Sequence, residues 1–140
     1  MPFESKHFQE SEFACKCGCG FANPKPELVA ALDLLRDLAD CPIKIDDACR
    51  CTAHNAEVGG VPHSQHPLGE AADIVFLCDP RLTNQQMYDL AKQVPAFQFG
   101  GIGLYASGTF IHVDTRQGKA RWFRDAHGAY VPFADSGVTE

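Results

Sequence analysis

The sequence predicts a single α+β domain, from its size and from the grouping of its helical and strand-like segments. The chain has 140 residues, of which 45% are hydrophobic and 21% charged, as is typical of one soluble globular domain. Helices that are segregated from a mostly antiparallel sheet define the α+β class. We expect one domain over residues 1–134 and a flexible tail over residues 135–140.

Two segments have the patterns of amphipathic helices. Asn23–Glu27 contains a capping Asn, prolines and an acidic residue, which are typical of a helix start. Apolar residues then recur on one face of Leu28–Ala39, while charged residues take the other face. A second helix is predicted to begin at the capping box Thr83–Gln86 and to end before Pro95. The first helix is expected to pack against a core and to carry no chemistry.

The remaining patterned segments predict strands. Ala71–Leu77 is almost continuously apolar, which is typical of a buried central strand. Ser107-Gly108 predicts a tight turn between the two strands of a hairpin. Gln117-Gly118 predicts another turn before a last strand. The other predicted strands are Pro42–Asp46, Gly101–Ala106, Thr109–Thr115 and Ala120–Phe123.

Charge and hydropathy exclude several classes of protein. The formal net charge of -6 disfavours a nucleic-acid-binding module, which usually carries a basic surface. No apolar run approaches the roughly 20 residues that a membrane-spanning helix needs. The first residues lack the basic and apolar regions of a signal peptide. We therefore expect a monomer that is cytoplasmic at synthesis.

The seven cysteines are an unusual feature of a chain of this length. An odd number leaves at least one thiol outside any disulfide within a monomer. Cys15, Cys17 and Cys19 have a C-x-C-x-C spacing, which differs from the C-x2-C spacing of structural zinc knuckles. We interpret these three as packed or opportunistically paired thiols, and the sequence leaves the cysteine pairing open.

A possible metal site involves three residues that are distant in sequence. His66 lies in a loop rich in Pro and Gly, and Asp73 lies near the start of the apolar strand, where a buried carboxylate needs a partner. On an extended strand, His112 and Asp114 share one face, while Ile111 and Val113 point to the core. Two imidazoles and one carboxylate are the ligands of a catalytic zinc ion. The alternatives are that His66 caps a loop and that Asp73 belongs to a turn at the end of the strand, since spacing alone does not distinguish these roles from metal binding.

The segment Ser64–Asp73 reads S-x-H-x-x-G-x-A-x-D, and a strand with His112-Val113-Asp114 follows it. This pattern resembles the zinc D-Ala-D-Ala carboxypeptidase family. That family includes phage L-alanyl-D-glutamate endolysins and shares its fold with the hedgehog signalling domain. Phe13–Gly20, Arg50-Cys51 and Gly100–Tyr105 resemble its small phage-associated branch. The resemblance extends over most of the chain and implies a hedgehog/DD-peptidase fold.

The resemblance implies a zinc peptidase that acts on peptidoglycan stem peptides, as a D,D-carboxypeptidase or an endopeptidase. The zinc ligands that it implies are His66, Asp73 and His112. It also implies that Arg50 receives a carboxylate or carbonyl of the substrate, which suits the planar fork of a guanidinium group. The absence of a signal peptide would fit a phage-type lysin released through a separate pore, or a cytoplasmic protein of prophage origin.

The sequence departs from the family pattern at two positions. Asp47-Ala48-Cys49-Arg50 replaces the usual Ser-Gly-Tyr-Arg, which changes the wall of the substrate pocket. Thr109 stands where several members have an acidic general base, and a threonine cannot take a proton from water. Asp114, about 6.8 Å of strand rise from His112, is the nearest substitute, and it could instead orient a ligand. The other candidates for the base are His63, Glu70 and His54.

Three alternative functions remain open. Because of Thr109, the chain could be a zinc-containing module that binds cell-wall peptide without cleaving it. His112-Val113-Asp114 also fits a non-haem iron oxygenase, although two amphipathic helices do not suit an all-β jelly roll and His127 follows too closely for the distal ligand. A redox or structural protein based on Cys15–Cys19 would depend on its thiols rather than on the histidines.

Overall fold

The computed structural model describes residues 3–15, 17–19, 22–49 and 69–131. The predicted flexible tail, His66 and Arg50 lie outside these described residues. The elements, in chain order, are η1 (Glu10–Phe13), α1 (Pro26–Ala39), β1 (Ile43–Asp47), β2 (Ala71–Phe76), α3 (Asn84–Lys92), α4 (Pro95–Gln98), β3 (Gly101–Tyr105), β4 (Ile111–Asp114), β5 (Ala120–Arg124) and β6 (Tyr130–Val131).

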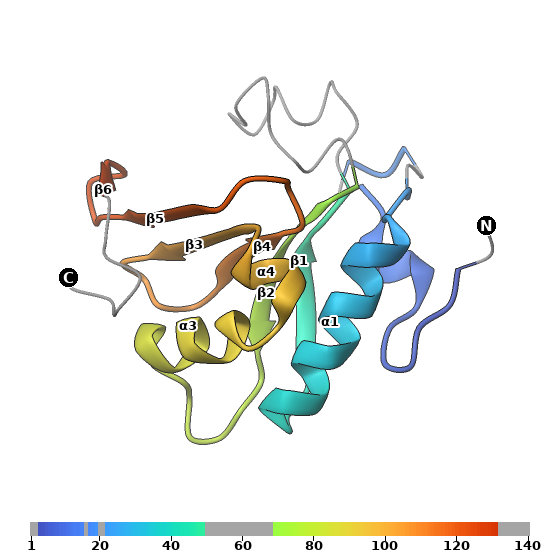
Figure 1. The fold of residues 1–140 in the computed structure, drawn as a ribbon, viewed down its shortest axis with the longest axis horizontal. Coiled ribbons are helices and arrows are strands. Elements are labelled where there is room, and N and C mark those ends of the chain that lie inside the picture. Colours follow the sequence, from blue (N-terminus) through green and yellow to red (C-terminus); the bar gives the residue numbers. More distant parts are fainter. Residues whose placement is uncertain (1–2, 16, 20–21, 50–68, 132–140) are drawn as a thin grey trace.

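The strands form one sheet, in the order β1-β2-β4-β3-β5-β6. Every neighbouring pair is antiparallel except β3 and β5, which are parallel. Helices α1, α3 and α4 pack against this sheet and against one another (Figure 1). The predicted α+β class, with a mostly antiparallel sheet, is therefore confirmed.

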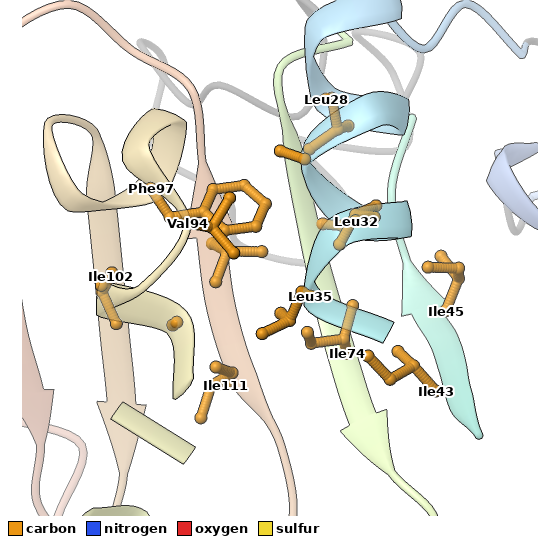
Figure 2. Close-up of a cluster of buried hydrophobic side chains, with 14 of the residues drawn as sticks. Leu28, Leu32, Leu35, Ile43, Ile45, Ile74, Val94, Phe97, Ile102 and Ile111 are labelled. Carbon is orange, nitrogen blue, oxygen red and sulfur yellow. The ribbon is translucent and has the colours of Figure 1, made fainter. Parts of the chain in front are cut away.

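The hydrophobic core lies between the helices and one face of the sheet. Leu28, Leu32 and Leu35, which recur on one face of α1, are completely buried. Figure 2 shows these leucines packed opposite strand residues that include Ile74 and Ile111. Alternate strand residues reach this core, so the residues between them belong to the opposite face of the sheet. We call that second face the site face.

The helix boundaries follow the predicted signals closely, with two differences. The side-chain oxygen of Thr83 accepts the backbone N–H of Gln86, as the capping box predicts. Helix α1 begins after Lys25, two residues later than a capping Asn23 would place it. Helix α3 ends at Lys92, before Pro95 as predicted. Pro95 then opens the short helix α4, because proline is well tolerated in a first helical turn.

Two further findings in the described residues concern the pairing of the cysteines and membrane-spanning helices. Cys41 and Cys78 form a disulfide, a pairing that the sequence left open. It joins the segment that precedes β1 to the segment that follows β2, so it fastens two neighbouring strands of the sheet. No helix within the described ranges has the length and apolar character needed to cross a membrane.

Candidate metal centre and active site

The strand register places two of the three predicted metal ligands, Asp73 and His112, in one row across the site face. Asp73 of β2 lies opposite His112 of β4, and His112 lies opposite Gly103 of β3. Gly103 in turn lies opposite Trp122 of β5. Because directly opposed residues point to the same face of a sheet, Asp73, His112 and Trp122 all belong to the site face. A one-residue slip of β4 would move His112 into the core.

His112 and Asp73 are in direct contact. Nδ1 of His112 lies 3.1 Å from Oδ1 of Asp73. The two residues are only 6% and 8% exposed. Two ligand atoms at about 2.0–2.2 Å from a tetrahedral zinc ion lie roughly 3.3–3.6 Å apart. The observed 3.1 Å is slightly shorter, so a small separation of the two atoms would admit a shared metal ion. His66, the third predicted ligand, lies outside the described residues.

Asp114 contacts the second ring nitrogen of His112. Its Oδ2 atom lies 2.7 Å from Nε2 of His112, which can donate its proton to this carboxylate. Arg116 donates from Nε and Nη2 to the same carboxylate, at 2.9 and 2.7 Å. The backbone N–H of Gly101 donates to Oδ1 at 2.8 Å. Asp114 is fully buried, so these donors fix it as an ionised anchor for the imidazole.

The electrostatics of the site follow from these contacts. Burial alone would raise the pKa of Asp114, but hydrogen bonds from His112 and Arg116 outweigh burial and hold this pKa well below its usual range. Burial alone would lower the pKa of His112, but Asp114 and Asp73 outweigh burial and raise it to about 9. The imidazole thus lies between two carboxylates, and the gap between Nδ1 and Asp73 attracts a cation, either a proton or a metal ion.

Trp122 forms a wall beside His112 that the sequence analysis did not predict. The two ring centroids are 4.9 Å apart, and the guanidinium carbon of Arg116 lies 5.4 Å from the Trp122 ring. A Cβ atom at Gly103 would overlap the Trp122 indole, and one at Gly101 would overlap the Asp114 carboxylate. The alternation of Gly101 and Gly103 on the strand that pairs with His112 was the signal for these bulky neighbours.

A groove with a volume of about 490 Å³ lies at the end of the β3–β4 hairpin. The rings of Tyr105 and Phe110 stack in it with their centroids 4.2 Å apart. Burial, together with the nearby charge of Asp73, raises the pKa of Tyr105. Tyr105 lies two residues after Gly103 on β3, so it belongs to the same face of the sheet as His112 and Trp122. The residues that line the groove are Tyr105, Ala106, Ser107, Phe110, Arg124, Asp125, Ala126 and Gly128.

The structure also describes Thr109, which stands at the family's usual base position, and Glu70, another candidate for the base. Thr109 is exposed, and its hydroxyl lies 3.0 Å from that of Ser107. The carboxylate of Glu70 accepts a 2.8 Å hydrogen bond from Lys25. His54 and His63 lie outside the described residues. The identity of the base therefore stays a prediction.

A buried histidine–aspartate pair on one face of an α+β sheet can supply two of the three protein ligands of a catalytic zinc ion. Comparison with protein families identifies the family: residues 6–114 match Peptidase M15. The chain therefore belongs to the M15 peptidases, and the resemblance drawn from its motifs is confirmed. No curated protein shows significant similarity to it. The matched region includes Asp73, His112 and Asp114, and it ends before Arg116 and Trp122.

Proposed function

We propose that this protein is a zinc-dependent peptidase that hydrolyses peptide bonds in peptidoglycan stem peptides, as a D,D-carboxypeptidase or an endopeptidase. Membership of the M15 peptidases supports hydrolysis of a peptide. The 3.1 Å contact between Nδ1 of His112 and Oδ1 of Asp73 is the observation that carries the metal assignment. The same two atoms are the ones that a zinc ion would join.

The proposed zinc ligands are His66, Asp73 and His112. These side chains would hold a zinc ion, which would supply Lewis acidity for polarising the scissile carbonyl and acidifying water. Nδ1 of His112 would face the ion, because Asp114 accepts a hydrogen bond from Nε2 and so sets the tautomer of the ring. The protein's contribution is to hold this tautomer and the ring orientation before substrate arrives.

Asp114 is better suited to positioning His112 than to serving as the general base. Its carboxylate is fully buried and accepts hydrogen bonds from His112, Arg116 and Gly101. The lowered pKa of Asp114 makes it a weak acceptor of a proton from water. We therefore propose the orienting role for Asp114, one of the two roles that the sequence left open.

We propose that two parts of the protein bind the substrate. Arg50 would receive a carboxylate or carbonyl of the peptide, since a guanidinium group matches a carboxylate with two hydrogen bonds. The groove beside Tyr105 and Phe110 offers a mixed aromatic and polar surface for the rest of the peptide. Binding at both places would hold the scissile carbonyl next to the metal, which is where positioning contributes to catalysis.

The test is incubation of the purified, zinc-loaded protein with murein sacculi and with synthetic stem peptides, followed by mass spectrometry of the products. We expect new free amino groups at the cleaved bond, loss of their release on chelation, and none above background with Asp73→Asn. Zinc binding without any release would favour the cell-wall binding module. Stoichiometric iron and oxygen-dependent turnover would favour the oxygenase.

A further inference from the structure

Three cysteines close to the N-terminus form a compact cluster that the proposed peptidase reaction does not use. The Sγ atoms of Cys15, Cys17 and Cys19 all lie within 4.8 Å of one another. The sulfurs of Cys15 and Cys17 are 3.4 Å apart. Cys15 is buried, whereas Cys17 and Cys19 are exposed. The cluster therefore has one ligand anchored in the protein and two that solvent ions can reach.

A turn of the backbone brings these sulfurs together despite the C-x-C-x-C spacing. The backbone N–H of Gly18 donates to the carbonyl oxygen of Cys15 at 3.3 Å. Gly18 has a φ of 87°, a left-handed conformation that glycine adopts without steric cost. The chain reverses here, so Cys19 returns towards Cys15 and Cys17. Separate zinc knuckles need C-x2-C spacing, whereas this single turn gathers three sulfurs that have C-x-C-x-C spacing.

We propose that Cys15, Cys17 and Cys19 bind a thiophilic cation, with Zn²⁺ as the first candidate, at a site separate from the hydrolytic one. Thiolates are the ligands that select zinc and other soft ions. Sulfurs bonded to tetrahedral zinc at about 2.3 Å lie roughly 3.8 Å apart, between the shortest separation in this cluster, 3.4 Å, and its 4.8 Å limit, so only small shifts are needed. A disulfide would engage two of the sulfurs, whereas a metal ion engages all three.

The position of the cluster suggests what an ion there would stabilise. Phe13, two residues before Cys15, is fully buried, and its carbonyl oxygen accepts the backbone N–H of Cys49 at 3.1 Å. An ion at the cluster would stabilise the turn that follows Phe13, whose carbonyl oxygen pairs with Cys49 just after β1.

The experiment is a Co²⁺ titration of the reduced full-length protein, followed by near-ultraviolet absorption, where thiolate-to-cobalt charge transfer appears. We expect this band in the wild type and in His112→Ala, which removes a ligand only from the proposed hydrolytic site. We expect Cys17→Ser/Cys19→Ser to abolish it. The matched control Cys41→Ser/Cys78→Ser, which removes two cysteines from elsewhere, should keep it.

Zinc content measured on the same variants separates the two sites. Two zinc ions per chain are expected in the wild type, one in His112→Ala and one in Cys17→Ser/Cys19→Ser. Because Cys17 and Cys19 are exposed, their replacement should leave the folded state intact, which circular dichroism checks. The proposal is overturned if the reduced wild type shows no charge-transfer band, or if the band survives in Cys17→Ser/Cys19→Ser. Neither result would affect the proposed peptidase activity.

Discussion

The two faces of the sheet differ in what they demand of each side chain, and strand β4 contributes to both. Ile111 and Val113 are fully buried in the core under the helices, where apolar groups of similar volume can replace one another. His112 and Asp114 lie on the site face, where each nitrogen and oxygen has a specific partner. Neighbouring residues of one strand therefore serve stability and chemistry separately, and their register keeps the two apart.

The sharpest test of this separation is His112→Ala on the site face. We expect peptide hydrolysis to fall by about a thousandfold or more, because a metal Lewis acid contributes several kcal/mol to catalysis. The melting temperature measured in the presence of a chelator should fall by only a few degrees, because Arg116 and Gly101 still donate to the buried Asp114 carboxylate. Unfolding of the variant under assay conditions would show that His112 serves the fold as well as the site.

The matched change on the covered face is Ile111→Ala, one residue earlier in the same strand. Ile111 is completely buried, so the lost packing should lower the free energy of unfolding by about 2–5 kcal/mol. Urea unfolding measures this loss. Hydrolysis per folded molecule, assayed well below the midpoint, should stay close to the wild-type value. A large fall in that activity would mean that the two faces are not independent.

Asp114→Asn tests whether Asp114 orients His112 or acts as the general base. If Asp114 orients His112, zinc affinity should fall by about 10- to 100-fold, while kcat at saturating zinc is largely retained. If Asp114 is instead the general base, kcat should fall at saturating zinc and the affinity should change little. Competition with a chromophoric chelator and steady-state kinetics on the same preparation distinguish these outcomes.

The pH dependence of metal binding gives a smaller but graded effect. The pKa of His112 is raised to about 9 by its two carboxylate neighbours, and the ring must lose its Nδ1 proton to bind zinc. Apparent zinc affinity at this site should therefore weaken by up to about tenfold for each pH unit below 9. The titration is best made on Cys17→Ser/Cys19→Ser, in which thiol ionisation at the cysteine cluster does not contribute. An affinity independent of pH between 7 and 9 would contradict the proton competition.

The covered face was largely predictable from the sequence, since its signals are local. The apolar spacing of Leu28–Ala39 predicted α1, and the capping box at Thr83 predicted the start of α3. The apolar run at Ala71 predicted β2. Helix α4 was missed, because four residues are too few to show a helical period. The parallel pairing of β3 with β5 depends on non-local contacts, which no short pattern encodes.

The site face was predictable only where a motif carried the information. The resemblance implied Asp73 and His112 as metal ligands, and the structure brings these two together. The wall formed by Trp122 and the clamp of Arg116 on Asp114 were not predicted. Both depend on side chains that meet only after the strands pair. Such contacts leave an indirect trace in the sequence, here the two glycines of β3 that make room for them.

The central claim is that Asp73 and His112 share one metal ion through Oδ1 and Nδ1. Crystals of the zinc-loaded protein, measured on both sides of the zinc absorption edge, test it directly. We expect an anomalous peak at about 2.0–2.2 Å from both atoms, with Nε2 of His112 still bonded to Asp114. A zinc ion bound through Nε2, or a peak outside bonding distance of Asp73, would contradict the account.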